Sequence, residues 1–167
     1  ANFLKISPNN KIPAIVDQNG PRGEPISVFE SGAILQYLAR KSAQFYPNDE
    51  VERIEVEQWL MWQMAGFGPM LGQNHHFSRF APERIVYATE RYINETKRLY
   101  RVLDTQLTNR DYVAGDYSIA DMAILPWILR HEWQQVDLAD YPHVLAYMQR
   151  LTARPAVQRA LAIQLTA

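Results

Sequence analysis

The sequence predicts a small α/β unit followed by an all-helical domain, and three observations carry this prediction. Two short apolar stretches, residues 14–16 and 26–29, flank a segment at 18–23 whose asparagine, glycines and proline are typical of a β-hairpin turn. The second stretch runs directly into an amphipathic helix pattern at 32–41. No strand-like alternation follows residue 29, so we expect only helices beyond a short linker at 45–49.

Two long helices are expected after this linker. Residues 50–64 carry a wide stripe of tryptophans and other apolar side chains, which predicts the first. Glycines and a proline at 66–69 should kink or interrupt it before the pattern resumes toward Phe77. The second is predicted to open at Pro82, because proline is well tolerated in a first helical turn. Its expected buried stripe is Ile85, Ala88, Tyr92, Leu99, Val102, Leu103 and Leu107.

A local signal for another helix start lies at Ser118. Ser118 and Asp121 have the spacing of a capping box, in which each side chain bonds the backbone N–H of the other residue. Residues 122–127 are apolar on nearly every face, so we expect the central helix of the domain here. On this interpretation Asp121 is structural, and a catalytic role is the weaker alternative. A final pair of helices is predicted at about 141–153 and 155–164.

Composition excludes several classes of function. With 17 basic and 18 acidic residues among 167, the formal charge of −1 offers no field for nucleic acid or an anionic membrane. Without cysteine, the chain supplies no disulfide, no Cys-ligated metal and no cysteine nucleophile. It contains no run of about 18 apolar residues and no signal-peptide pattern, so we expect a cytoplasmic protein. His75 and His76 lack companion ligands at metal-binding spacing, and no metal site is predicted.

Two short motifs place polar recognition groups at one end of the predicted hairpin. Ile12 precedes Pro13 just before the first strand, and such a backbone edge can pair with a peptide main chain. Glu30 and Ser31 stand where the second strand becomes a helix. The free N–H groups there and the Ser31 hydroxyl suit a carboxylate, and Glu30 suits an ammonium. Glutathione offers all three matching groups. The structural alternative is that Ser31 only caps the helix and Glu30 only favours its dipole.

Longer motifs give the chain a resemblance to a known family. An Ile-Pro before a hairpin, a Glu-Ser at the strand-to-helix turn and a Ser-Ile-Ala-Asp box in an all-α second domain occur in this order. The order resembles that of the cytosolic glutathione transferases. The runs at 7–17, 29–35 and 68–77 resemble the bacterial Nu class of disulfide-bond oxidoreductases, which groups with the fungal nitrogen-regulator proteins.

This resemblance implies a fold and its boundaries: a partial thioredoxin-like, glutathione-binding domain at 1–44, followed by an all-α C-terminal domain at 48–167. In the family, the thioredoxin-like domain opens with a βαβ segment that holds the hydroxyl or amide facing the glutathione sulfur. This chain begins after that segment, so no catalytic residue is expected within it. Because an isolated hairpin with one helix is only marginally stable, we expect the natural protein to carry the absent strands.

The resemblance also implies roles for single residues. Pro13 would be cis and turn the Ile12 backbone toward a cysteinyl main chain, although only about 5–6% of X–Pro bonds in folded proteins are cis. Lys11 would hold the glycyl carboxylate, with a solvated loop lysine as the equally weighted alternative. Arg91 would hold a carboxylate of a second glutathione, and the alternative is an ion pair with Glu95.

The sequence is compatible with three functions. The first is a glutathione-dependent disulfide oxidoreductase that uses the thiol of bound glutathione, with glutathione or oxidised glutathione across the cleft between the domains. The second is conjugation of glutathione to a small electrophile, or hydroperoxide reduction, at the same site. The third is a non-catalytic, transferase-like interaction module. The resemblance further implies a homodimer.

Overall fold

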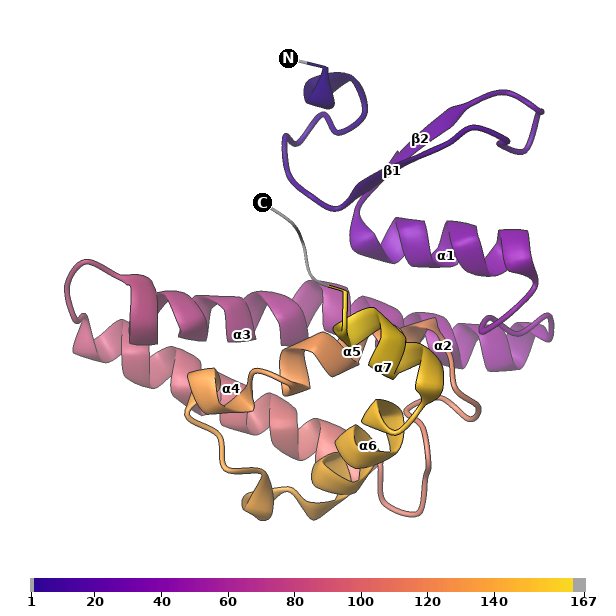
Figure 1. Ribbon diagram of the computed structural model, residues 1–167. Coiled ribbons are helices and arrows are strands. Elements are labelled where there is room, and N and C mark those ends of the chain that lie inside the picture. The colour runs from indigo at the N-terminus through magenta and orange to yellow at the C-terminus, as the bar shows by residue number, and fades with distance from the viewer. Residues whose placement is uncertain (1, 164–167) are drawn as a thin grey trace.

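The computed structural model describes residues 2–163 and shows a β-hairpin with one helix standing above a helical bundle (Figure 1). The sheet has two strands, and the hairpin is followed only by helices among these residues, as the sequence predicts. The helices and strands are β1 (Ala14–Asp17), β2 (Ile26–Phe29), α1 (Ser31–Ser42), α2 (Glu50–Trp62), α3 (Gly68–His75), α4 (Val86–Gln106), α5 (Ile119–Ile128), α6 (Pro142–Thr152) and α7 (Pro155–Leu161). The shorter turns are the 3₁₀ turns η1 (Phe3–Lys5), η4 (His131–Gln134) and η5 (Leu138–Asp140), and the π turns η2 (Gln63–Phe67) and η3 (His76–Phe80).

The hairpin is held on α1 by a polar cluster around Asp17. Strands β1 and β2 pair antiparallel, from Ala14 opposite Phe29 at one end to Asp17 at the turn end. Tyr37 of α1 donates a hydrogen bond of 2.6 Å to Asp17, and Lys41 of the same helix forms an ion pair with it. Lys41 first and Tyr37 second lower the pKa of Asp17 to about 2. These contacts fix the hairpin against the helix that follows it.

One uninterrupted helical run extends from α2 through η2 and α3 to η3. In Figure 1, α2 and α3 lie end to end as a single long rod. Asp49 caps its start by accepting from the backbone N–H of Val51 at 2.9 Å. The prediction of a kink or break at 66–69 is only partly right, because a π turn at η2 replaces the break. Pro69 lies in the first turn of α3, where the lack of a backbone N–H is tolerated.

Helix α4 begins later than the sequence predicts. Pro82 lies in an exposed connection, and the helix starts at Val86 with Ile85 as its N-cap. Ile85 is 45% exposed and therefore does not belong to the buried stripe. The first buried side chain is Thr89, so the residues before it gain little packing energy from being helical. The rest of the stripe packs as predicted: Ala88, Tyr92 and Val102 are half-buried, and Leu99, Leu103 and Leu107 are buried.

The predicted capping box opens α5, the central helix. Ser118 donates its backbone N–H to Asp121 at 2.8 Å, and its hydroxyl accepts from the N–H of Ala120 at 3.3 Å. Asp121 is fully buried and also accepts from the N–H of Val113 at 3.0 Å and the hydroxyl of Tyr147 at 2.7 Å. Its carboxylate therefore joins three segments of the domain. The structural interpretation of Asp121 is confirmed.

The last helices, α6 and α7, cover about the predicted ranges, except that α7 ends at Leu161. The predicted end at Gln164 falls outside the residues that the structure describes. Buried side chains from α1 to α6 form one hydrophobic core, to which α1 contributes Ala39 and the hairpin residues contribute none. Within residues 2–163, no helix has the length and apolar character needed to cross a bilayer.

Candidate functional site

The Ile12–Pro13 motif forms an exposed edge beside the first strand. The peptide bond between these residues is cis, as the resemblance implies. The Ile12 side chain is 85% exposed, and none of the hydrogen bonds among residues 2–163 uses its backbone N–H or C=O. The loop before it is closed from within, because the buried Ser7 hydroxyl donates to the Lys11 carbonyl at 2.8 Å. The main chain of Ile12 is therefore held in place and open to a partner.

Strand register brings this edge to the Glu30–Ser31 turn. The last ladder pair is Ala14 opposite Phe29, so the next positions outward are Pro13 and Glu30. Glu30 is exposed, and apolar side chains do not cover its carboxylate. The sequence motifs on either side of the hairpin thus meet at one end of the sheet.

The start of α1 presents unpaired donors at the same end. Glu30 occupies the N-cap position without a side-chain capping bond, and the first α1 hydrogen bond runs from the N–H of Ile34 to the Glu30 carbonyl at 2.9 Å. The amides of residues 31–33 precede that bond and face outward from the helix end. The Ser31 hydroxyl donates toward the Met64 sulfur at 3.6 Å rather than to its own helix. Capping by Ser31 is therefore not its role here, and these donors can serve an anion.

The backbone of Glu30 is unusual. Its φ of 71° and ψ of 123° lie in a region that residues with a Cβ seldom adopt. Such a conformation costs about 1–3 kcal/mol and persists where the surroundings impose it, typically at functional sites. Here it turns the chain sharply from β2 into α1.

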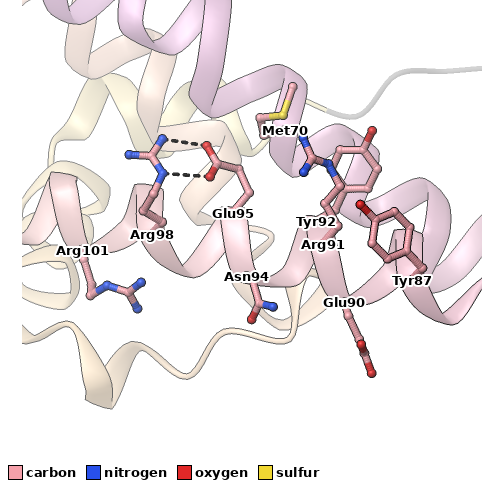
Figure 2. Close-up of a pocket in the computed structure, with 9 residues that line it drawn as sticks. All are labelled: Met70, Tyr87, Glu90, Arg91, Tyr92, Asn94, Glu95, Arg98 and Arg101. Carbon is pink, nitrogen blue, oxygen red and sulfur yellow. Dashed lines mark hydrogen bonds and ion pairs between the residues drawn. The ribbon is translucent and has the colours of Figure 1, made fainter.

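Arg91 lies in a pocket on the helical bundle. This pocket of about 670 Å³ is lined by α4 and by Met70 of α3. In Figure 2 the Arg91 side chain extends from α4 toward Met70, whereas Glu90 extends away. Glu95 forms a two-bond pair with Arg98, at 2.8 and 2.6 Å, which lowers the Glu95 pKa. The alternative pairing of Arg91 with Glu95 is absent from the ion pairs among residues 2–163.

The structure thus brings Ile12, Pro13, Glu30 and Ser31 together and places Arg91 apart from them. Ser31 touches Met64, whereas Met70 lines the Arg91 pocket. These methionines stand six residues apart on one helical run, a rise of about 9 Å. The Ser31 site and the Arg91 pocket therefore both contact the same helical run.

Sequence reasoning missed the wall beside Ser31. Met64 packs against Gly32 at the start of α1, and Trp127 of α5 lies against Gly68 and Gly72 of α3. A Cβ at Gly68 would lie 3.0 Å from the Trp127 ring nitrogen, so the glycine admits the indole directly against the helix. The sequence signals were Gly68, which we interpreted as one of the helix breakers at 66–69, and Gly72, which entered only as part of the run at 68–77 that carries the resemblance. Among residues 2–163, no group of three or more His, Cys, Asp or Glu could hold a metal ion.

Comparison with known proteins decides the family. Models of the glutathione S-transferase N-terminal and C-terminal domains match residues 1–40 and 75–155. The disulfide-bond oxidoreductase YfcG of Escherichia coli is 54% identical over 161 residues, covering 95% of this chain and 75% of that protein. The chain belongs to the glutathione S-transferase family. A second glutathione S-transferase relative, the disulfide-bond oxidoreductase YghU of Escherichia coli, is 42% identical and is covered over 59% of its length.

Solved glutathione transferases share the fold. A glutathione transferase from Pseudomonas putida, with one glutathione disulfide bound per subunit, superposes with a TM-score of 0.91 at 47% identity. The match covers 96% of this chain and 73% of that one. Ure2p in complex with S-hexylglutathione gives a TM-score of 0.87 at 31% identity, over 96% of this chain and 79% of the other. A partial thioredoxin-like unit followed by an all-helical glutathione-transferase domain is confirmed.

Proposed function

We propose that the chain binds glutathione and belongs to a glutathione-dependent disulfide oxidoreductase of the Nu class. The observation that carries this proposal is the juxtaposition of the cis Ile12–Pro13 edge with the exposed Glu30–Ser31 turn. The names of the relatives YfcG and YghU support the reaction, and the glutathione disulfide in the Pseudomonas putida structure supports the ligand.

Each end of a glutathione molecule finds a complementary group in this arrangement. The Ile12 backbone pairs with the cysteinyl main chain in the manner of an added strand. The amides at the start of α1 and the Ser31 hydroxyl take the γ-glutamyl carboxylate, and Glu30 takes the adjacent ammonium. Lys11 binds the glycyl carboxylate from the exposed loop beside Ile12. Fixing both ends of the ligand in this way orients its thiol, and orientation is the catalytic contribution of these residues.

These 167 residues contain no cysteine and supply no thiol, so the ligand's own thiolate is the proposed nucleophile. A glutathione thiolate attacks one sulfur of the substrate disulfide, so that a mixed disulfide forms and the other half leaves as a thiolate, which takes up a proton. A second glutathione repeats the exchange and releases oxidised glutathione and the second thiol. Arg91 holds a carboxylate of this second glutathione in its pocket on α4. No residue of the chain itself is assigned as catalytic.

We further propose that the protein is cytoplasmic and forms a homodimer, and that its domains span 1–44 and 48–167. Several large apolar side chains stand exposed on the outer surface of the bundle, which supports an interface there. They are Val51, Ile54 and Met61 of α2 and Tyr87 of α4. Analytical ultracentrifugation would detect the dimer, and a monomer at all concentrations would contradict it.

Calorimetric titration with glutathione tests the site. The double variant Glu30→Ala/Ser31→Ala should lose at least about tenfold in affinity, because it removes an ion pair and a hydroxyl contact. The matched control Glu24→Ala/Ser27→Ala makes the same changes at exposed hairpin positions and should bind as the parent does. Full affinity in the first variant would refute the site.

A second candidate function uses the same glutathione site. Ure2p has been solved with S-p-nitrobenzylglutathione, a conjugate of glutathione with an aromatic arm, which supports conjugation to electrophiles. Parallel assays with a small disulfide, a chloronitrobenzene and a hydroperoxide rank the reactions. The absence of turnover with all three in a protein that also carries the missing βαβ segment, with glutathione binding intact, would favour a non-catalytic module.

A further inference from the structure

A strip of side chains follows one side of the long helix away from the glutathione site. The strip consists of Met64, Gly68, Gly72, His75 and Arg79 of the long helical run. It is defined by the contacts of these residues, because the π turns at η2 and η3 change the helical period at its two ends. The strip starts at Met64, which touches both Ser31 and Gly32. The Trp127 ring then covers the two glycines, and His75 lies 5.9 Å from that ring between centroids.

Two arginines and a tryptophan form the far end of this strip. The Trp133 ring of η4 lies 5.7 Å from the His75 ring. The guanidinium of Arg79 stands 4.7 Å from the Trp133 ring centre, and that of Arg130 stands 4.9 Å from it. Trp133 is half-buried, whereas both arginines are exposed. The strip therefore ends in two cations held against one indole.

These two charges are not neutralised by the protein around them. The ion pairs among residues 2–163 include neither Arg79 nor Arg130, and neither guanidinium donates a hydrogen bond to another residue there. Burial, assisted by Arg130 and Arg79, lowers the pKa of His75, which keeps the imidazole neutral at neutral pH. The aromatic contacts fix the arginine positions without using up their hydrogen-bond donors.

Resting on the proposed function, we propose that the strip binds the second substrate and that Arg79 and Arg130 select acceptors carrying a carboxylate. The apolar part of the acceptor lies along Trp127 and His75, and its carboxylate meets the two guanidiniums beside Trp133. Guanidinium groups match a carboxylate in shape as well as charge. From Met64, beside Ser31, to Arg79 the helical run rises by about 22 Å, a distance that the glutathione moiety, a six-carbon arm and an arginine side chain span together.

Selection of the acceptor leaves the chemistry of the disulfide exchange unchanged. The sulfur of the bound glutathione forms a bond to one sulfur of the carboxylate-bearing disulfide, and the bond between the two substrate sulfurs breaks. The departing carboxylate-bearing thiolate takes up a proton. The second glutathione supplies the remaining electrons, so no further oxidant or reductant is needed.

A matched pair of stable conjugates tests the selection without requiring turnover. S-hexylglutathione and S-(5-carboxypentyl)glutathione have arms of equal length and differ in the terminal carboxylate. In calorimetric titrations we expect the carboxylate conjugate to bind about tenfold more tightly, from two exposed charge-assisted contacts. The variant Arg79→Gln/Arg130→Gln should remove this preference and bind S-hexylglutathione unchanged.

Two further variants separate position from net charge. Arg22→Gln/Arg159→Gln removes two exposed arginines elsewhere and should keep the preference. Arg79→Lys/Arg130→Lys keeps the charge and should retain part of the preference for the carboxylate conjugate. Equal affinity of the parent for both conjugates, or a preference unchanged in Arg79→Gln/Arg130→Gln, would overturn the selection while leaving the glutathione site intact. Failure of both conjugates and of glutathione to bind the parent would instead refute the glutathione site, and the selection with it.

Turnover gives the same comparison for true substrates. Dithiodiglycolate, 3,3′-dithiodipropionate and 4,4′-dithiodibutyrate carry carboxylates at increasing reach, and bis(2-hydroxyethyl) disulfide is uncharged. At least one carboxylate substrate should have a higher kcat/KM than the uncharged one, and Arg79→Gln/Arg130→Gln should abolish this advantage. If the uncharged disulfide is the best substrate of the four, the proposal is wrong.

Discussion

Replacement of Asp121 by alanine should destabilise the protein by about 3–6 kcal/mol. Its carboxylate is fully buried and accepts from the N–H of Val113, the N–H of Ser118 and the hydroxyl of Tyr147. Alanine leaves these three donors without an acceptor. The Ser118 hydroxyl is a fourth donor, at 3.3 Å, and is not counted because a hydroxyl can rotate toward another partner. Each orphaned buried donor costs about 1–2 kcal/mol, the lower part of the usual range, because the vacated space can admit water. Loss of a helix cap alone would cost only about 0.5–2 kcal/mol.

Asparagine at the same position separates the contributions. Oδ1 accepts from Val113 and Tyr147, and an asparagine retains this oxygen. The amide nitrogen would replace Oδ2 and face the Ser118 N–H, so one donor is orphaned and the expected loss is about 1–3 kcal/mol. The exposed Asp116 provides a control, and Asp116→Ala should change stability by no more than about 0.5 kcal/mol.

Urea denaturation followed by far-ultraviolet circular dichroism measures these differences, provided that the m-value stays constant. A loss of less than about 2 kcal/mol for Asp121→Ala would reduce the residue to a simple cap and refute the reasoning. If Asp121→Ala does not fold, Asp121→Asn provides the test. A loss of unfolding free energy in Asp121→Asn no larger than that in Asp116→Ala would contradict the prediction of an orphaned donor.

Two further predictions concern the hairpin and the long helix. The pKa of Asp17 is lowered from 3.8 to about 2, chiefly by Lys41. Between these two pH values the unfolded state binds more protons than the folded state does. The stability that Asp17 contributes is therefore lost as the pH falls from about 4 to about 2. Asp17→Asn should therefore flatten the acid limb of stability against pH. Gly68→Ala places a Cβ 2.5 Å from Nε2 of Gln63 and 3.0 Å from Nε1 of Trp127, so both side chains must shift, and the change should cost about 1–3 kcal/mol in thermal unfolding. Gly66→Ala meets nothing within 4 Å and should be neutral or stabilising by up to about 1 kcal/mol.

Local chemistry explains which elements the sequence predicts correctly. The hairpin and the capping box depend on residues within a few positions of one another, and both form as expected. The cis bond before Pro13 is different, because the residues alone favour trans and only the family resemblance indicates cis.

Long-range packing explains the errors. The expected break at 66–69 assumed that glycine and proline act through helix propensity alone. In the structure Trp127, far along the chain, packs against Gly68, and a π turn accommodates the proline. Pro82 permits a helix start but does not require one, and the helix begins only near the first side chain that finds a buried place. The strip that ends at Trp133 could not be predicted from the sequence for the same reason, because α3 and η4 come into contact only in the folded chain.

At Glu30, the positive φ lowers the stability of the protein, whereas the carboxylate serves ligand binding in our proposal. A glycine would adopt this backbone at no steric penalty, so selection for heat tolerance alone should favour it. The same exchange would remove the Glu30 carboxylate, which we propose meets the ammonium of the ligand. In a directed-evolution experiment, selection for thermostability alone should therefore replace Glu30 by glycine, whereas selection for ligand binding should retain it.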